Sequence, residues 1–205
     1  MIDPVSFALP EARNGLYESF YFRGTSTDGR HAFWLKHNLL RKNGQSTVVV
    51  ENAFVIFDRT TGEAEVVYDK EELSKAAAAS FFRSGSWEQA SANFSTGSFF
   101  SISREGLRGK LHTSRGTAQW DLVLNRSDEV LYQFASDRLY RLPWRKKKII
   151  TRDCFLRFSG RISCAGITVE GDFLGMNGHN WGTEHAHEYA YADCNLFAED
   201  AGAYF

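Results

Sequence analysis

The sequence lacks the marks of several protein classes. Its 205 residues contain only three cysteines, Cys154, Cys164 and Cys194, and their spacing is not that of a metal site. A sparse, odd set of thiols fits a reducing compartment better than a disulfide framework. No apolar run approaches ~20 residues and no basic segment precedes an apolar core at the start, so we expect a cytoplasmic protein with no transmembrane segment. The net charge of -1 gives no electrostatic reason to expect a nucleic acid partner.

Motifs for nucleotide chemistry and for serine hydrolysis are also missing. The chain has no phosphate-binding loop and no Gly-x-Gly-x-x-Gly fingerprint, so nucleotide-dependent chemistry is not expected. No Gly-x-Ser-x-Gly occurs, which leaves a serine nucleophile without support. The 43% hydrophobic and 24% charged residues are typical of a globular domain, and they argue against disorder and against a coiled coil.

Aromatic residues are abundant, at 15% of the chain, which suits a sheet protein with a large apolar interior. Runs rich in aromatic and branched residues alternate with Gly, Asn and Asp turns, and this predicts short antiparallel strands. The expected strands are residues 16–23, 31–40, 46–58, 63–68, 97–103, 107–113, 117–125, 130–134, 149–158 and 161–170. One helix is expected over residues 70–82, because Asp69 and Glu72 form a capping-box pattern before an alanine run. The pattern indicates an all-β barrel or sandwich with one helix.

A basic run, Arg145-Lys146-Lys147-Lys148, lies before the expected strand that begins at Ile149. Four adjacent like charges predict a solvated turn. The alternative is a contact with an anionic surface or a phosphate.

The segment 178–197 concentrates proton-transfer groups, since it holds three of the six histidines. If residues 184–191 form a strand, the two-residue side-chain period places one set of polar side chains on a common face. That set is His185, His187, Tyr189 and Tyr191. Such a face could perform acid/base chemistry or bind a metal.

The same segment carries a resemblance to a known family. The pattern His179-Asn180-Trp181-Gly182, followed by Cys194-Asn195-Leu196-Phe197, resembles the Asn-Trp-Gly and Asn-x-Phe signature of the tocopherol cyclase family, which is related to hydroxyneurosporene synthase (carotenoid hydratase). The aromatic run 21–40, with Trp34, is also similar to the family's opening. The resemblance implies a pair of antiparallel lipocalin-like (calycin) barrels, of which this chain would hold the first. The pair His185-Ala186-His187 departs from the family pattern.

The domain expectation follows from that resemblance. Residues 1–175 would form the lipocalin-like barrel domain, and residues 176–205 would lead into a second, truncated barrel. The strand-like segment 193–197 places Leu196 and Phe197 where they need partners, because an unpaired apolar strand is an aggregation hazard. We therefore expect the natural protein to continue beyond the sequence given.

Family members bind or act on isoprenoid or other apolar small molecules, and their chemistry protonates an alkene and adds an oxygen nucleophile. Such a reaction needs a positioned proton donor and a pocket that excludes water. The candidate catalytic residues are His179, Glu184 and Tyr191, near a turn expected at Trp181-Gly182. The candidate ligand-binding residues are Trp34, His37, Asn180, Trp181, His185, His187 and Tyr189.

Structural roles remain open for several of these residues. Asn180, Trp181 and Gly182 could form a turn in which the indole plugs a barrel end. His37 shares its face with apolar residues of its expected strand, so it is either a core histidine or a ligand contact.

The function expected is that of a cofactor-independent hydratase, cyclase or isomerase acting on an apolar, isoprenoid-like substrate. A non-catalytic lipid or pigment binding protein is the alternative, because the same barrel would serve it. A cupin-like metal site at His185 and His187 is a further alternative. Its remaining ligands would have to come from His179, His112 or Asp193, so we expect no metal. Neither the ligand nor the oligomeric state follows from the sequence.

Overall fold

The computed structural model describes residues 15–74, 90–140, 142 and 146–184. Within these ranges the chain is nearly all β, which confirms the expected fold class. The strands are β1 (Leu16–Ser26), β2 (His31–Arg41), β3 (Thr47–Asp58), β4 (Glu63–Ser74), β5 (Ala90–Asn93), β6 (Phe99–Ile102), β7 (Gly106–Thr113), β8 (Gly116–Asn125), β9 (Val130–Tyr132), β10 (Lys147–Cys164) and β11 (Ile167–Gly182). The helix α2 covers Asp137–Tyr140.

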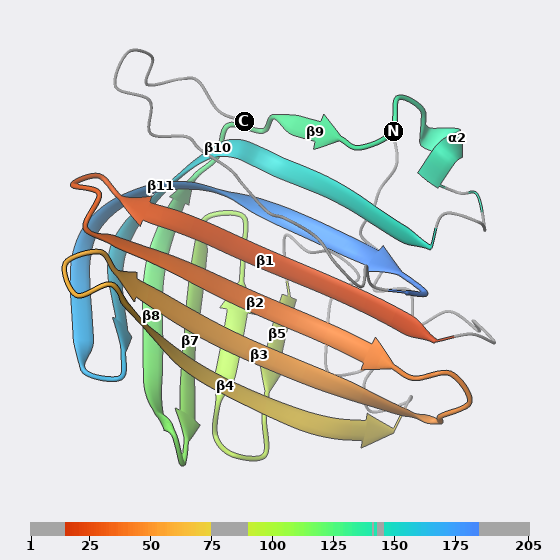
Figure 1. The fold of residues 1–205 in the computed structure, drawn as a ribbon, viewed down its shortest axis with the longest axis horizontal. Helices are drawn as coiled ribbons and strands as arrows, with labels where there is room; N and C mark the ends of the chain where they lie inside the picture. Colours follow the sequence, from red (N-terminus) through yellow and green to blue (C-terminus); the bar gives the residue numbers. More distant parts are fainter. Residues whose placement is uncertain (1–14, 75–89, 141, 143–145, 185–205) are drawn as a thin grey trace.

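All the described strands belong to one antiparallel sheet in the order β4-β3-β2-β1-β11-β10-β8-β7-β6-β5, and β9 pairs with β10. The sheet curls on itself, so that β1 to β4 form one wall and β5 to β8 form the other (Figure 1). The long strands β10 and β11 join the two walls. The result is a curled half-barrel with an inner and an outer face.

The first hairpin shows how local chemistry sets the register. The side chain of Asp28 accepts hydrogen bonds from the Ser26 hydroxyl at 2.6 Å and from the Arg30 backbone N–H at 3.0 Å. Gly29 follows with φ 69°, a left-handed conformation that suits glycine. The Asp28-Gly29 turn predicted from the sequence is therefore confirmed, and it aligns β1 with β2.

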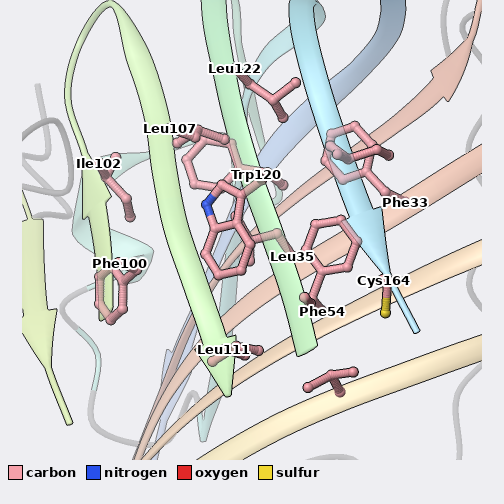
Figure 2. Packing of buried hydrophobic residues seen from close by; sticks show 14 of the residues in the cluster. Phe33, Leu35, Phe54, Phe100, Ile102, Leu107, Leu111, Trp120, Leu122 and Cys164 are labelled. Carbon is pink, nitrogen blue, oxygen red and sulfur yellow. The ribbon is translucent and has the colours of Figure 1, made fainter. Parts of the chain in front are cut away.

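Apolar side chains, many of them aromatic, pack on the inner face of the half-barrel (Figure 2). The ring of Phe33 stacks on Phe54 at 6.1 Å and meets the edges of Phe158 and Phe173 at 5.2 and 5.3 Å. Phe54 also stacks on Trp120 of the opposite wall at 5.4 Å. Burial of each such side chain stabilises the fold by about 2–3 kcal/mol, so these contacts hold the two walls together.

The helix expected over residues 70–82 is wrong at its start, because residues 70–74 belong to β4. Asp69 does not cap a helix. Its buried carboxylate accepts a hydrogen bond from the Thr96 hydroxyl, and Glu71 accepts one from the Ser95 backbone N–H at 2.9 Å. These bonds tie β4 to the turn between β5 and β6, and tertiary contacts override the local helix signal. Residues 75–82 lie outside the described ranges.

The boundary expected between strands 149–158 and 161–170 is also wrong. Gly160 lies inside β10, where a Cβ atom would come within 2.2 Å of the Asp121 backbone oxygen on β8. Its lack of a side chain permits close strand packing. The turn instead lies at Ala165-Gly166, with φ 49° and 97°. Strand β11 then runs without a break across residue 175, and the expected division at that residue stays a prediction.

Candidate functional site

The strand register gathers polar side chains on the inner face, next to the aromatic core. His37 of β2 is paired with Asn52 of β3 on one side and with Phe20 of β1 on the other. Phe20 is in turn paired with His179 of β11. Glu18 lies two residues before Phe20 and therefore shares the same face. A row of buried polar groups thus crosses four strands.

Glu18 and His179 form the central contact of this row. The carboxyl Oε1 lies 2.8 Å from Nε2 of the imidazole, and the two side chains are 2% and 4% exposed. Burial raises the pKa of Glu18 well above its usual range. Burial, with a smaller contribution from the positive charge of Arg152, lowers the pKa of His179 to about 3. Both shifts favour an uncharged pair, which keeps one transferable proton at neutral pH.

Aromatic rings hold the imidazole of His179 in place. It stacks on Phe20 at 4.1 Å and on Trp181 at 4.6 Å. Trp181 stacks further on Tyr140 at 5.8 Å, and the Tyr140 hydroxyl donates a hydrogen bond to the Ile149 carbonyl at 3.1 Å. The pair is therefore rigidly placed, and the faces of these rings would attract a developing positive charge.

His37 is a second buried histidine on the same face. Its ring stacks on Phe100 at 3.9 Å, and burial lowers its pKa to about 3 despite a favourable interaction with Asn52. Within the described residues, neither ring nitrogen of His37 and neither amide atom of Asn52 makes a hydrogen bond. Two inter-strand spacings of about 4.8 Å put His37 about 10 Å from His179.

Glu184 lies elsewhere, in solvent. Its carboxylate forms a 2.7 Å ion pair with the exposed ammonium of Lys146, so it does not share the buried environment of Glu18. The turn expected at Trp181-Gly182 is wrong, because both residues end β11. The reason is close packing, since a Cβ atom on Gly182 would come within 1.8 Å of the Lys146 backbone oxygen.

The remaining candidates divide between the outer face and the undescribed part of the chain. Trp34 and Asn180 alternate with inward residues and so lie on the outer face, where Trp34 meets the edge of Tyr21 at 6.1 Å. The other four candidates fall outside the described residues: His185, His187, Tyr189 and Tyr191. Within the described ranges, no group of three or more His, Cys, Asp or Glu side chains could hold a metal ion.

Glu18 was not among the residues predicted for the site, although its position in the sequence is unusual for a charged residue. In β1 the residues Leu16, Phe20 and Phe22 have the same parity as Glu18, so a carboxyl stands in an apolar, inward-facing series. A single charged residue at such a position is a candidate for a shifted pKa. The local pattern could not identify the partner of Glu18, because His179 is 161 residues away in the chain.

Comparison with known proteins supports the fold and leaves the family open. No protein-family model matches the sequence, and no curated protein matches it. A similar solved structure is that of a Nitrosomonas europaea protein provisionally named AttH, with a TM-score of 0.53 and 12% identity. The match covers 90% of this chain and 56% of that protein, so the chain spans about half of its length. Similarity at this identity shows the fold alone.

The described residues contain no helix that is long and apolar enough to cross a membrane.

Proposed function

We propose that the protein binds an apolar small molecule against the inner face of the half-barrel and transfers a proton to it from the Glu18–His179 pair. The observation that supports this proposal is the buried 2.8 Å contact between the two groups. A carboxyl whose pKa is raised by burial stays protonated near neutral pH, as a general acid requires.

The chemistry would be that of a hydratase, cyclase or isomerase. The proton of the pair adds to one carbon of an alkene, and the π electrons form the new C–H bond. Water or a hydroxyl of the substrate then attacks the cationic carbon and returns its proton to the pair. In an isomerisation, the neighbouring carbon loses the proton instead. The rings of Phe20 and Trp181, stacked on the imidazole, would stabilise the cation. Tyr191 and Glu184 remain proposed donors from the sequence.

A non-catalytic carrier of a lipid or pigment is the second candidate. It is favoured by the curled half-barrel fold, which would serve binding without any proton transfer. Removal of the acid group separates the two, because a carrier keeps its ligand affinity and has no turnover to lose.

The test uses geranylgeraniol, an isoprenoid alkene, incubated with the protein in D₂O. Mass spectrometry measures deuterium incorporation into carbon. We expect Glu18→Gln to lower the rate by roughly 10²-fold or more. The exposed Glu170→Gln is the matched control and should leave the rate unchanged. No incorporation by the wild type, together with equal binding by Glu18→Gln in a tryptophan-quenching titration, would favour the carrier.

A further inference from the structure

A groove lies at the rim of the half-barrel, where β1 begins and β2 ends. Its volume is about 630 Å³, within the range of small-molecule sites. It is lined by residues 15–17, 40–43, 146, 183 and 184. The groove therefore combines segments from the two ends of the described chain.

The lining pairs apolar surface with positive charge. Leu16, Leu40 and Tyr17 supply the apolar part, and three cationic side chains stand around it. Those are Arg41, Lys42 and Lys146, and among the described lining residues they are opposed by one carboxylate, that of Glu184. The described part of the lining is therefore net positive, in a chain whose net charge is -1. Such a surface is complementary to an anion that carries an apolar chain.

The ion pair between Lys146 and Glu184 shows how a carboxylate binds in this groove. Glu184 Oε1 lies 2.7 Å from Lys146 Nζ, and both side chains are exposed. The backbone N–H of Thr183 donates to the Lys146 carbonyl at 2.9 Å, which holds the two segments together. Exposed pairs contribute only about 0.2–1 kcal/mol, so a ligand carboxylate could displace Glu184. The basic run predicted as a solvated turn contributes Lys146 here, whereas Lys147 and Lys148 begin β10.

The groove also lies close to the proton-transfer pair. Leu16 is two residues before Glu18 on the same face of β1, a distance of about 7 Å along a strand. Arg41 is the cross-strand partner of Leu16 and is buried on that face. An anion held at the rim would thus let an attached apolar chain extend over Leu16 toward Glu18 and His179.

We propose that this groove binds the anionic end, a carboxylate or a phosphate, of an amphipathic small molecule. The direction of its apolar part, toward Glu18 and His179, rests on the proposed function. Recognition of the anion by Lys42 and Lys146 does not.

Isothermal titration calorimetry of the full chain tests the proposal with dodecanoate as probe and dodecanol as its uncharged counterpart. The double variant Lys42→Gln/Lys146→Gln should raise the Kd of dodecanoate about 5- to 10-fold and leave that of dodecanol unchanged. Glu184→Gln should lower the Kd of dodecanoate about 2- to 5-fold, because it frees Lys146. Lys110→Gln, an exposed lysine on β7, is the control and should change neither.

Equal dodecanoate binding by the wild type and the double variant would overturn the proposal. So would a Kd that rises in Glu184→Gln. Inorganic phosphate and phosphatidylglycerol vesicles identify the source of the anion. Competition by phosphate alone as strong as by dodecanoate, or cosedimentation with vesicles that persists in the double variant, would contradict an amphipathic small molecule.

The outcome is separable from that of the proposed function. Calorimetry measures only the Kd of the probe, whereas deuterium incorporation measures the rate of proton transfer and its loss in Glu18→Gln. A charge-dependent dodecanoate site with no effect of Glu18→Gln would leave the groove assigned and refute the proton-transfer role. The reverse result would refute the groove alone.

Discussion

The buried titratable groups predict a maximum of stability near pH 6.5. His37 and His179 have pKa values of about 3 in the folded protein, and 6.5 is the usual value for histidine. The unfolded chain therefore takes up more protons as the pH falls below 6.5, so each histidine contributes stability that is lost on acidification. Glu18 has the opposite sign. The pKa of Glu18 in the folded protein lies above the usual 4.5. Its contribution to the stability of the fold is therefore full below pH 4.5 and is lost as the pH rises.

The magnitude follows by counting protons. Between pH 4.5 and 6.5 the effects of Glu18 and His179 cancel, because their pair holds one proton in both states. Of these three groups, only His37 then contributes to the slope, and its contribution to stability falls by about 1.4 kcal/mol for each unit of acidification. Above pH 6.5 the unfolded pair loses its proton, whereas the raised pKa of Glu18 keeps the carboxyl of the folded pair protonated to a higher pH. Stability therefore falls with rising pH, by at most about 1.4 kcal/mol for each unit.

Urea unfolding followed by circular dichroism at intervals from pH 5 to 8 measures these slopes. His37→Phe should flatten the curve below pH 6.5 while leaving the alkaline side unchanged. Glu18→Gln should remove the alkaline slope and roughly double the acidic one. A wild-type stability that is constant from pH 6.5 to 8 would refute the reasoning, since it would mean that the folded pair holds no extra proton.

Two further predictions concern the frame around the site. Gly109→Ala places a Cβ atom 2.1 Å from Cζ2 of Trp120, so thermal unfolding should show a loss of about 1–3 kcal/mol, and an unchanged Tm would contradict the tight packing. Asp153→Asn weakens a buried contact with Arg126 at 3.2 Å and with Asn177 at 2.7 Å, so urea unfolding should show a loss of about 3 kcal/mol or more. Asp121→Asn, in an exposed pair with Arg108, should lose less than about 1 kcal/mol, and equal losses would argue against the role of burial.

Local patterns were sufficient to predict most strands. Alternating burial along β3 and β8 and the Asp28-Gly29 turn are features of neighbouring residues, and they follow directly from the sequence. The helix expected after Asp69 failed because its apparent cap binds Thr96, a residue 27 positions away. The residues next to Asp69 in the sequence do not predict such a contact.

For the candidate site, the motif proposed His179 and Trp181 together, and the structure stacks the two rings. Glu184, the carboxyl group proposed from the sequence, is exposed and paired with Lys146. The carboxyl group beside His179 is that of Glu18, because β1 and β11 are adjacent in the sheet, and pairing between distant strands is not encoded in either segment alone.

Infrared spectroscopy at pH 7 tests the protonated Glu18–His179 pair most directly. The spectrum of the wild type minus that of Glu18→Gln isolates the Glu18 side chain. If Glu18 is protonated, the difference spectrum contains the carbonyl band of a carboxyl group, which is lost in the variant and retained in the control Glu170→Gln. A difference spectrum that contains only carboxylate bands would contradict that protonation, because the pair would then hold no carboxyl proton to transfer.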